Sequence, residues 1–304
     1  MNLRRRRACP LAPGLIAIGL VIATLLSFAV AQRRTPELPS GFQPQGKWAS
    51  DPTWYDGLVE KATYDAEMVI YGRQRKFEAV FLTNKEQHDA ATWTKDADGK
   101  GQLVEVWKHN QVEVVPTPNY EYKFVTTAHL RTDDLSLTRL DASSQEWCGA
   151  SFKQYQRNPA GGWDYTGFSY LPEQGRRGGT VARDADLPVV PFNALPLWLR
   201  GYEFEKGAPM RLMMIPDQKH NGISAPEPYP VMVSLRDKTE EGYVVELGED
   251  PRGPNGEEGE PRRIGMFTFA RDRNHVMLTY EGADGQKYRL KELERVNYWT
   301  RDEE

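Results

Sequence analysis

Cys148 is the residue of this sequence best suited to covalent chemistry. It is one of two cysteines among 304 residues and lies in the string Gln145-Glu146-Trp147-Cys148-Gly149. Cysteine catalysis needs a lowered thiol pKa, which a nearby histidine or a helix N-terminus normally provides. His129 is the candidate partner, because only a short segment separates its expected strand from that of Cys148. Hydrolysis or thiol redox chemistry at Cys148 is therefore one interpretation.

The competing interpretation is that Cys148 fills space in a β-sheet. In the period-2 pattern of a strand, Cys148 shares a face with Glu146 and Phe152, whereas Trp147 points to the other side. A small side chain that behaves as an apolar one suits a packed face. The sequence favours this packing interpretation, which leaves Glu146 in need of a basic partner. The candidates for that partner are Lys123, Arg131 and Arg139.

The five histidines show no local metal-binding pattern. They stand at positions 88, 109, 129, 220 and 275, and none are spaced as His-x-His or His-x-x-x-His. The string at 96–101 resembles the start of a calcium loop, but Lys100 and Trp107 occupy positions that require an oxygen ligand and a glutamate. The sequence also has no phosphate-cradling loop and no dinucleotide fingerprint. It therefore predicts no metal site and no cofactor.

Aromatic residues are the second candidate functional feature. The chain has eight Trp and fourteen Tyr, and Trp163, Tyr165, Phe168 and Tyr170 follow Trp147 on an adjacent expected strand. Core packing is the ordinary role of such residues, since aromatic side chains bury large areas. The functional alternative is an apolar groove on a curved sheet that shelters an acyl chain or a peptide. These four residues are the candidate groove aromatics.

The first residues of the chain predict export. Arg4–Arg7 precede an apolar run that ends in Ala29-Val30-Ala31, which is the pattern of a secretory signal with cleavage after Ala31. The alternative is an inner-membrane anchor at residues 11–31. Cleavage would remove four Arg from a chain of net charge −4, which leaves −8. This balance argues against a nucleic-acid partner and is compatible with a hydrophobic ligand or an envelope protein.

The remaining sequence predicts one mainly β domain. Residues 32–53 are rich in proline and predict a flexible linker, and ordered structure is expected from Trp54 to about residue 300. Segments of period-2 hydrophobicity dominate this range, and Phe192–Leu199 predicts one short helix packed on the sheet. An acidic, Gly/Pro-rich stretch at 249–261 predicts an exposed loop. The expected fold is a curved antiparallel sheet or half-barrel, like that of lipoprotein carriers, with one or two short helices.

The order of these segments resembles an uncharacterised family of exported bacterial proteins, often labelled "septum formation inhibitor Maf". The resemblance covers about Trp54 to Glu281, and the string 145–149 is its most specific part. Family members often carry His after that glycine, where this chain has Ala150. True Maf proteins are cytoplasmic α/β nucleotide pyrophosphatases, so the label implies no activity for an exported β-sheet protein. The resemblance implies a localisation and a fold style.

Two functional classes follow from the sequence. The first is a non-enzymatic cell-envelope protein that binds a lipid, a peptide or a partner protein on its curved sheet. The second is a hydrolase or thiol-redox protein that uses Cys148. The membrane is expected to be contacted only through the N-terminal segment, and only if that segment stays uncleaved.

Overall fold

The computed structural model describes residues 42–96, 98–184, 186–250 and 262–297. The described residues all belong to one compact unit, which begins at Pro36. The predicted signal segment (1–31) lies outside the described residues, as does most of the acidic loop predicted at 249–261. Among the described residues, no helix is long and apolar enough to cross a membrane.

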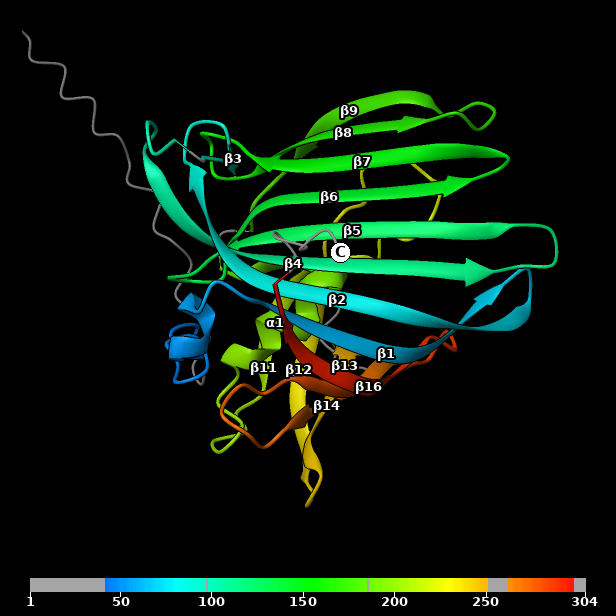
Figure 1. Cartoon of the computed structure of the whole chain (residues 1–304). Coiled ribbons are helices and arrows are strands. Elements are labelled where there is room, and N and C mark those ends of the chain that lie inside the picture. Colours follow the sequence, from blue (N-terminus) through cyan, green and yellow to red (C-terminus); the bar gives the residue numbers. More distant parts are fainter. Residues whose placement is uncertain (1–41, 97, 185, 251–261, 298–304) are drawn as a thin grey trace, which may run out of the picture. The chain divides into compact units, whose positions relative to one another are not determined.

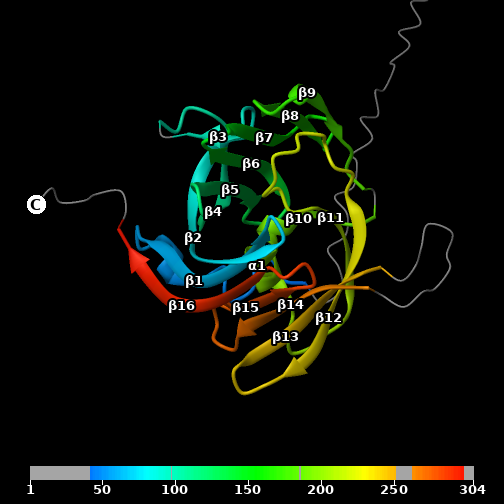
Figure 2. The ribbon, with the colours of Figure 1, turned by 90° about the vertical axis from the view of Figure 1, so that its right-hand side faces the viewer.

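Strands dominate the described residues and join into one open, curved, 16-stranded sheet (Figure 1, Figure 2). Its order is β10-β11-β12-β13-β14-β15-β16-β1-β2-β4-β5-β6-β7-β8-β9, with β3 paired to β2. In the described part of the chain the pairs are antiparallel, apart from the parallel pair β10 and β11. The predicted mainly β class, with a curved sheet, is confirmed. The strands are β1 (Val59–Ile70), β2 (Arg73–Asp89), β3 (Thr94–Lys95), β4 (Leu103–Pro116), β5 (Glu121–Arg131), β6 (Leu137–Glu146), β7 (Gly149–Arg157), β8 (Trp163–Ser169), β9 (Gly175–Val181), β10 (Val189–Pro191), β11 (Met210–Ile215), β12 (Tyr229–Lys238), β13 (Gly242–Glu249), β14 (Arg263–Ala270), β15 (Met277–Gly282) and β16 (Lys287–Val296).

The hairpin of β1 and β2 shows how local sequence determines the pairing. The two strands pair from Glu60 opposite Thr83 to Ile70 opposite Arg73, without a register shift. Tyr71 and Gly72 form the turn, with φ of 53° and 69°. Positive φ at both central residues gives the twist that matches two antiparallel strands, and glycine adopts this conformation without strain.

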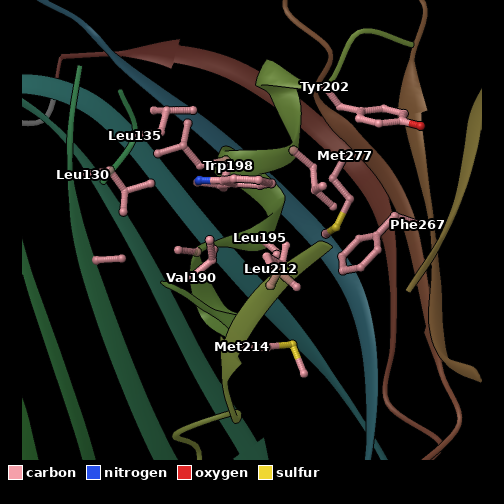
Figure 3. Packing of buried hydrophobic residues seen from close by; sticks show 14 of the residues in the cluster. Leu130, Leu135, Val190, Leu195, Trp198, Tyr202, Leu212, Met214, Phe267 and Met277 are labelled. Atoms are coloured by element: carbon pink, nitrogen blue, oxygen red, sulfur yellow. The ribbon is translucent and has the colours of Figure 1, made fainter. Parts of the chain in front are cut away.

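One short helical segment packs on the concave side of the sheet. It consists of η2 (Phe192–Ala194), α1 (Leu195–Trp198) and η3 (Leu199–Gly201). Pro196 stands near the start of α1, where its missing N–H costs nothing, and the four residues of α1 are all buried. Trp198 lies among buried aliphatic residues of the sheet (Figure 3). The segment agrees with the helix predicted over 192–199.

Residues 42–53 correct the predicted position of the linker. Phe42 and Trp48 are buried, and the Phe42 ring stacks on Trp198 with centroids 4.0 Å apart. Trp48 stacks on Trp107 of β4 at 5.1 Å, and Trp54 Nε1 donates a hydrogen bond to the Trp48 carbonyl at 2.6 Å. The expectation that ordered packing begins near Trp54 is therefore wrong. Large aromatic side chains bury this stretch in spite of its prolines.

A buried ion pair joins the helical segment to the sheet. The Arg200 guanidinium donates to both carboxylate oxygens of Glu60 on β1, at 2.6 and 3.2 Å. Both side chains are almost fully buried. Two parallel hydrogen bonds of this kind orient the pair as well as neutralise it.

A candidate binding surface at the hairpin end of the sheet

Four connections lie at one end of the sheet, and most of the residues singled out by sequence lie in or beside them. These connections are Tyr71–Gly72, Thr117–Tyr120, Trp147–Cys148 and Tyr170–Gln174. In an antiparallel sheet built from successive hairpins, every second connection falls at the same end. Figure 1 shows these turns together at the right-hand end of the ribbon, and Figure 2 views the molecule from that side.

The position of Cys148 overturns the packing interpretation. β6 ends at Glu146 and β7 begins at Gly149, and these two residues pair across the strands. Trp147 and Cys148 therefore form a tight two-residue turn, and Cys148 is exposed. The prediction that Cys148 fills space on an inner face is wrong, because the turn interrupts the alternation on which it rested.

Tyr120, which the sequence did not single out, organises this turn. Its hydroxyl donates to Glu146 Oε2 at 3.2 Å and lies 2.9 Å from Cys148 Sγ. The Trp147 ring stacks on the Tyr120 ring, with centroids 5.6 Å apart and planes 20° apart. The hydrogen bond with Cys148 is the main cause that raises the pKa of Tyr120 to about 12. The hydroxyl therefore stays protonated at neutral pH and holds the turn as a donor.

Glu146 has polar partners in place of the basic ones expected. Besides Tyr120, it accepts a hydrogen bond from the side-chain amide of Asn221. Arg139 instead pairs with Asp141 at 2.6 Å, and Arg131 pairs with Asp133. The predicted pairing of Glu146 with either arginine is wrong. Asn221 reaches the carboxylate from a segment far away in sequence, which spacing along one strand cannot reveal.

Further aromatic rings extend from this turn along β5. The Tyr120 and Tyr122 centroids are 5.5 Å apart, and those of Tyr122 and Phe124 are 6.0 Å apart. Tyr71 meets Tyr122 edge to face at 6.1 Å, and their hydroxyls are hydrogen-bonded. Tyr120 directly precedes β5, and Tyr122 and Phe124 are alternate residues of that strand, so the three rings lie in one row. This row connects the Tyr71 turn to the Trp147 turn.

Gly149 connects the same surface to Tyr170. A Cβ atom on Gly149 would lie 2.9 Å from Tyr170 Cδ1, closer than carbon atoms normally approach. The Tyr170 ring therefore lies across Gly149, and the backbone N–H of Tyr170 donates to the Ala150 carbonyl at 3.0 Å. The last residue of the Gln145–Gly149 string thus has a structural reason to be glycine.

We call the four residues Tyr71, Tyr120, Trp147 and Tyr170 the aromatic rim.

The candidate groove aromatics do not form one surface. Trp163 and Tyr165 are buried, whereas Phe168 is 44% and Tyr170 80% exposed. Residues 163 and 165 of β8 point into the core, and residue 168 points to the opposite face, as the period of two requires. The expected groove therefore does not exist, because two of its four aromatic residues lie in the core and a third lies on the opposite face of the sheet. Only Tyr170 joins the aromatic rim.

The structure separates Cys148 from the histidine proposed as its partner. Lys123 of β5 pairs with Gln145, close to the Cys148 turn, whereas His129 pairs with Arg139 further along the same strands. Six residues of strand correspond to about 20 Å. His129 therefore lies too far away to accept a proton from Cys148. The hydrogen-bond partner of the thiol is the Tyr120 hydroxyl.

The concave side of the sheet is filled from within the chain. The segment 216–224 follows β11 in the connection to β12. Polar side chains of the sheet donate hydrogen bonds to its backbone carbonyls. Lys153 Nζ donates to the carbonyls of Gln218 and His220 at 2.5 and 2.7 Å, and the Tyr165 hydroxyl donates to the Ile223 carbonyl at 2.7 Å. Buried polar groups of the sheet therefore have partners in this segment.

The space between the helical segment and the sheet is correspondingly small. The cavity lined by Phe81, Phe192 and Tyr288 has a volume of about 10 Å³. Such a volume holds about one water molecule and no acyl chain. The concave face is thus a packed core at this point. The exposed aromatic surface lies at the hairpin end instead.

Comparison with known proteins finds a similarity in structure. No protein-family model and no curated protein matches the sequence. A solved structure that matches is a β-barrel-like protein of a domain of unknown function, DUF1849, from Brucella abortus. The sequence identity is 10%, the match covers 79% of this chain and 98% of that chain, and the TM-score is 0.44.

Proposed function

We propose that this chain is an exported, non-enzymatic binding protein of the cell envelope and that its aromatic rim binds a partner protein. The carrying observation is that Trp147, Tyr170 and Tyr71 are 83%, 80% and 76% exposed. These are the highest values among the large hydrophobic side chains of the described residues, and all three residues lie in connections at one end of the sheet. Exposed Trp and Tyr gathered on one surface are typical of protein interfaces.

The rim is held in place before any partner arrives. Tyr120 supports Trp147 by stacking, and its hydroxyl is engaged by Glu146 and Cys148. Tyr71 is fixed by its hydroxyl contact with Tyr122. Side chains that are already ordered lose little conformational entropy on binding, so more of the contact energy remains as affinity.

The filled concave side leaves no room for an acyl chain at the helical segment, which favours a protein over a lipid as the partner. Charged side chains of both signs surround the rim. Glu121 and Glu173 are exposed in or next to the connections at this end, and so are Arg73, Lys123 and Arg176. A protein surface carries both signs of charge itself and can pair with this mixture.

A binding role also fits the surroundings of Cys148 better than catalysis does. The thiol contacts a protonated tyrosine hydroxyl, which is no general base at neutral pH. The histidine of β5 is about six residues further along the sheet, roughly 20 Å away. Export rests on the basic and apolar pattern before Ala31. N-terminal sequencing of the mature protein tests it, and a chain that begins at Gln32 is expected.

Site-specific crosslinking tests the rim in its natural setting. A photoreactive amino acid replaces Trp147 or Tyr170 in cells that express the protein, and the crosslinked partner is identified and purified. Its affinity is then measured for the unmodified chain and for Trp147→Ala and Tyr170→Ala. Interface aromatic residues of this kind contribute about 2 kcal/mol or more, so a loss of roughly 30-fold is expected for Trp147→Ala.

Tyr55 provides the matched control. It is 63% exposed but lies in the short 3₁₀ helix η1 (Pro52–Tyr55), outside the rim. Tyr55→Ala should leave the affinity within about threefold of the unmodified chain. Equal affinity in all variants would refute the rim as the binding surface. If the rim crosslinks only to lipid and binding to phospholipid vesicles depends on Trp147, the rim binds a membrane and the proposal of a partner protein is wrong.

A further inference from the structure

A buried carboxylate and two imidazoles converge on the outer face of the sheet, away from the aromatic rim. Glu86 and His88 are alternate residues of β2 and therefore share a face. His129 comes from β5, and the intervening strand β4 places Lys108 directly opposite His129. The core residues Phe81 and Trp107 alternate with these positions on β2 and β4. The cluster therefore lies on the other side of the sheet from the core.

The atoms of this cluster meet closely. His88 Nε2 lies 2.8 Å from Glu86 Oε1, and His129 Nε2 lies 3.5 Å from the same oxygen. The ring centroids of the two histidines are 4.7 Å apart. One ligand atom from each of the three residues lies within 4.8 Å of the others. Small side-chain movements would bring all three atoms to the distances of a metal coordination sphere.

The cluster is buried and incompletely paired. The Glu86, His88 and His129 side chains are 7%, 2% and 9% exposed. Glu86 Oε2 and the Nδ1 atoms of both histidines are buried without a hydrogen-bond partner among the described residues. Buried polar atoms of this kind are rare in native proteins, and an unoccupied ion site is one established reason for them.

The donor set suits a transition metal. Imidazole nitrogens and a carboxylate oxygen are common metal ligands in proteins. Two nitrogen ligands and one carboxylate suit Zn²⁺, whereas Ca²⁺ and Mg²⁺ require oxygen ligands.

We propose that Glu86, His88 and His129 bind one divalent transition-metal ion, with Zn²⁺ the expected species. The three side chains supply three ligands, and a fourth position remains for water or a further group. Lys108 Nζ and Lys95 Nζ lie 3.9 and 4.0 Å from Glu86 Oε2, with side chains 22% and 53% exposed. Lys108 is the more buried of these two cations, and the ion displaces it towards solvent. The site is independent of the rim and of any partner bound there.

Titration of the purified full-length protein tests the site. The protein carries no affinity tag, is stripped with a chelator and is titrated with ZnCl₂ in a calorimeter. One ion per chain is expected, together with a higher melting temperature at saturating Zn²⁺. His88→Gln and His129→Gln should each weaken Zn²⁺ binding by more than roughly 100-fold. Loss of a group that only hydrogen-bonds to a metal ligand weakens binding by roughly 10- to 100-fold, and these variants lose a ligand itself. His275→Gln, outside the cluster, should bind as the unmodified chain does.

Two measurements keep the test decisive if a buried histidine variant fails to fold. Lys108→Gln retains all three ligands and should bind Zn²⁺ several-fold more tightly, because it removes a positive charge near the ion. Co²⁺ bound to the unmodified chain should show the intense visible absorption of four-coordinate cobalt. Absence of stoichiometric binding, binding that His88→Gln and His129→Gln leave unchanged, or binding that Lys108→Gln does not strengthen would overturn the proposal.

Discussion

The Tyr120 hydroxyl lies 2.9 Å from Cys148 Sγ and also donates to Glu146 Oε2 at 3.2 Å. One tyrosine therefore ties the exposed thiol to the last residue of β6. Because this contact is at the surface, the thiol is open to reagents and its replacement leaves no hole in a core. These two consequences distinguish the observed turn from the packed strand that the sequence favoured.

We predict that native Cys148 is alkylated as fast as an exposed thiol and that its replacement hardly changes stability. Cys148→Ser and Cys148→Ala should each change the free energy of unfolding by less than about 0.5 kcal/mol. Timed alkylation followed by mass spectrometry, and urea unfolding of both variants, provide the measurements. Protection of the thiol until denaturation, or a serine variant destabilised by about 2 kcal/mol more than the alanine variant, would contradict the exposed position.

The buried pair of Arg200 and Glu60 should be strongly coupled. Glu60→Gln leaves the Arg200 charge buried without its counterion, and removal of one partner of such a pair costs about 3–5 kcal/mol. The urea midpoint of unfolding should fall accordingly at unchanged slope. Lys61 on the same strand forms a half-exposed pair with Glu294, so Lys61→Gln is the control. It should cost no more than about 1 kcal/mol, and an equal loss in both variants would contradict the prediction.

His109 should make the fold sensitive to acid. It is fully buried on β4 with Nδ1 2.9 Å from Thr83 Oγ1, and burial lowers its pKa from 6.5 to about 3. Below pH 6.5 the unfolded chain binds a proton that the folded chain does not take up until about pH 3. The contribution of His109 to stability is therefore complete above pH 6.5 and is lost as the pH falls towards 3.

Comparison with His109→Gln isolates this effect from that of other groups. The difference in unfolding free energy between the two proteins should shrink or change sign when the pH is lowered from neutral to about 4.5. Urea unfolding at both pH values measures it. A difference that stays constant with pH would show that His109 titrates alike in the folded and unfolded chains.

Much of the fold could be predicted from local sequence patterns, because most strands show an alternation of apolar and polar residues with a period of two. The helical segment at 192–201 agrees with the helix expected over 192–199 because the helix signals there are local. The turn at Trp147–Cys148 lacked such a signal. Neither residue is Gly, Asn, Asp or Pro, so an interrupted pair of strands was read as one strand. Because this turn was missed, Cys148 was predicted to be buried, whereas it is exposed.

The sites depended on contacts that no spacing along one strand encodes. Tyr120 and Asn221 reach Glu146 from positions 26 and 75 residues away. His129 meets Glu86 and His88 across an intervening strand, so a search for closely spaced histidines passes over the cluster. Strand register decides these contacts, and register follows from the order of sixteen strands in the sheet.

The final prediction concerns Lys153, which holds the segment 216–224 against the sheet. Its ammonium group is buried, and burial lowers its pKa from 10.5 to about 8 in spite of the opposing charge of Asp217. Between pH 8 and 10.5 the folded chain has released this proton while the unfolded chain still binds it. The contribution of Lys153 to stability should therefore rise with pH across this window, since at this group the unfolded state binds more protons.

Lys153→Met should remove this contribution, because the side chain nearly keeps its length and loses its titration. The stability of the unmodified chain relative to the variant should therefore increase between about pH 8 and about pH 10. The variant should also be less stable near neutral pH, since the carbonyls of Gln218 and His220 lose their donor. Lys206→Met, at a side chain that is 69% exposed, is the control and should keep the pH dependence of the unmodified chain. Urea unfolding at about pH 8 and about pH 10 measures the change in unfolding free energy with pH for each of the three proteins. If the stabilities of Lys153→Met and of the unmodified chain change equally across this window, the amine titrates as a solvated lysine and does not hold the segment from a buried position.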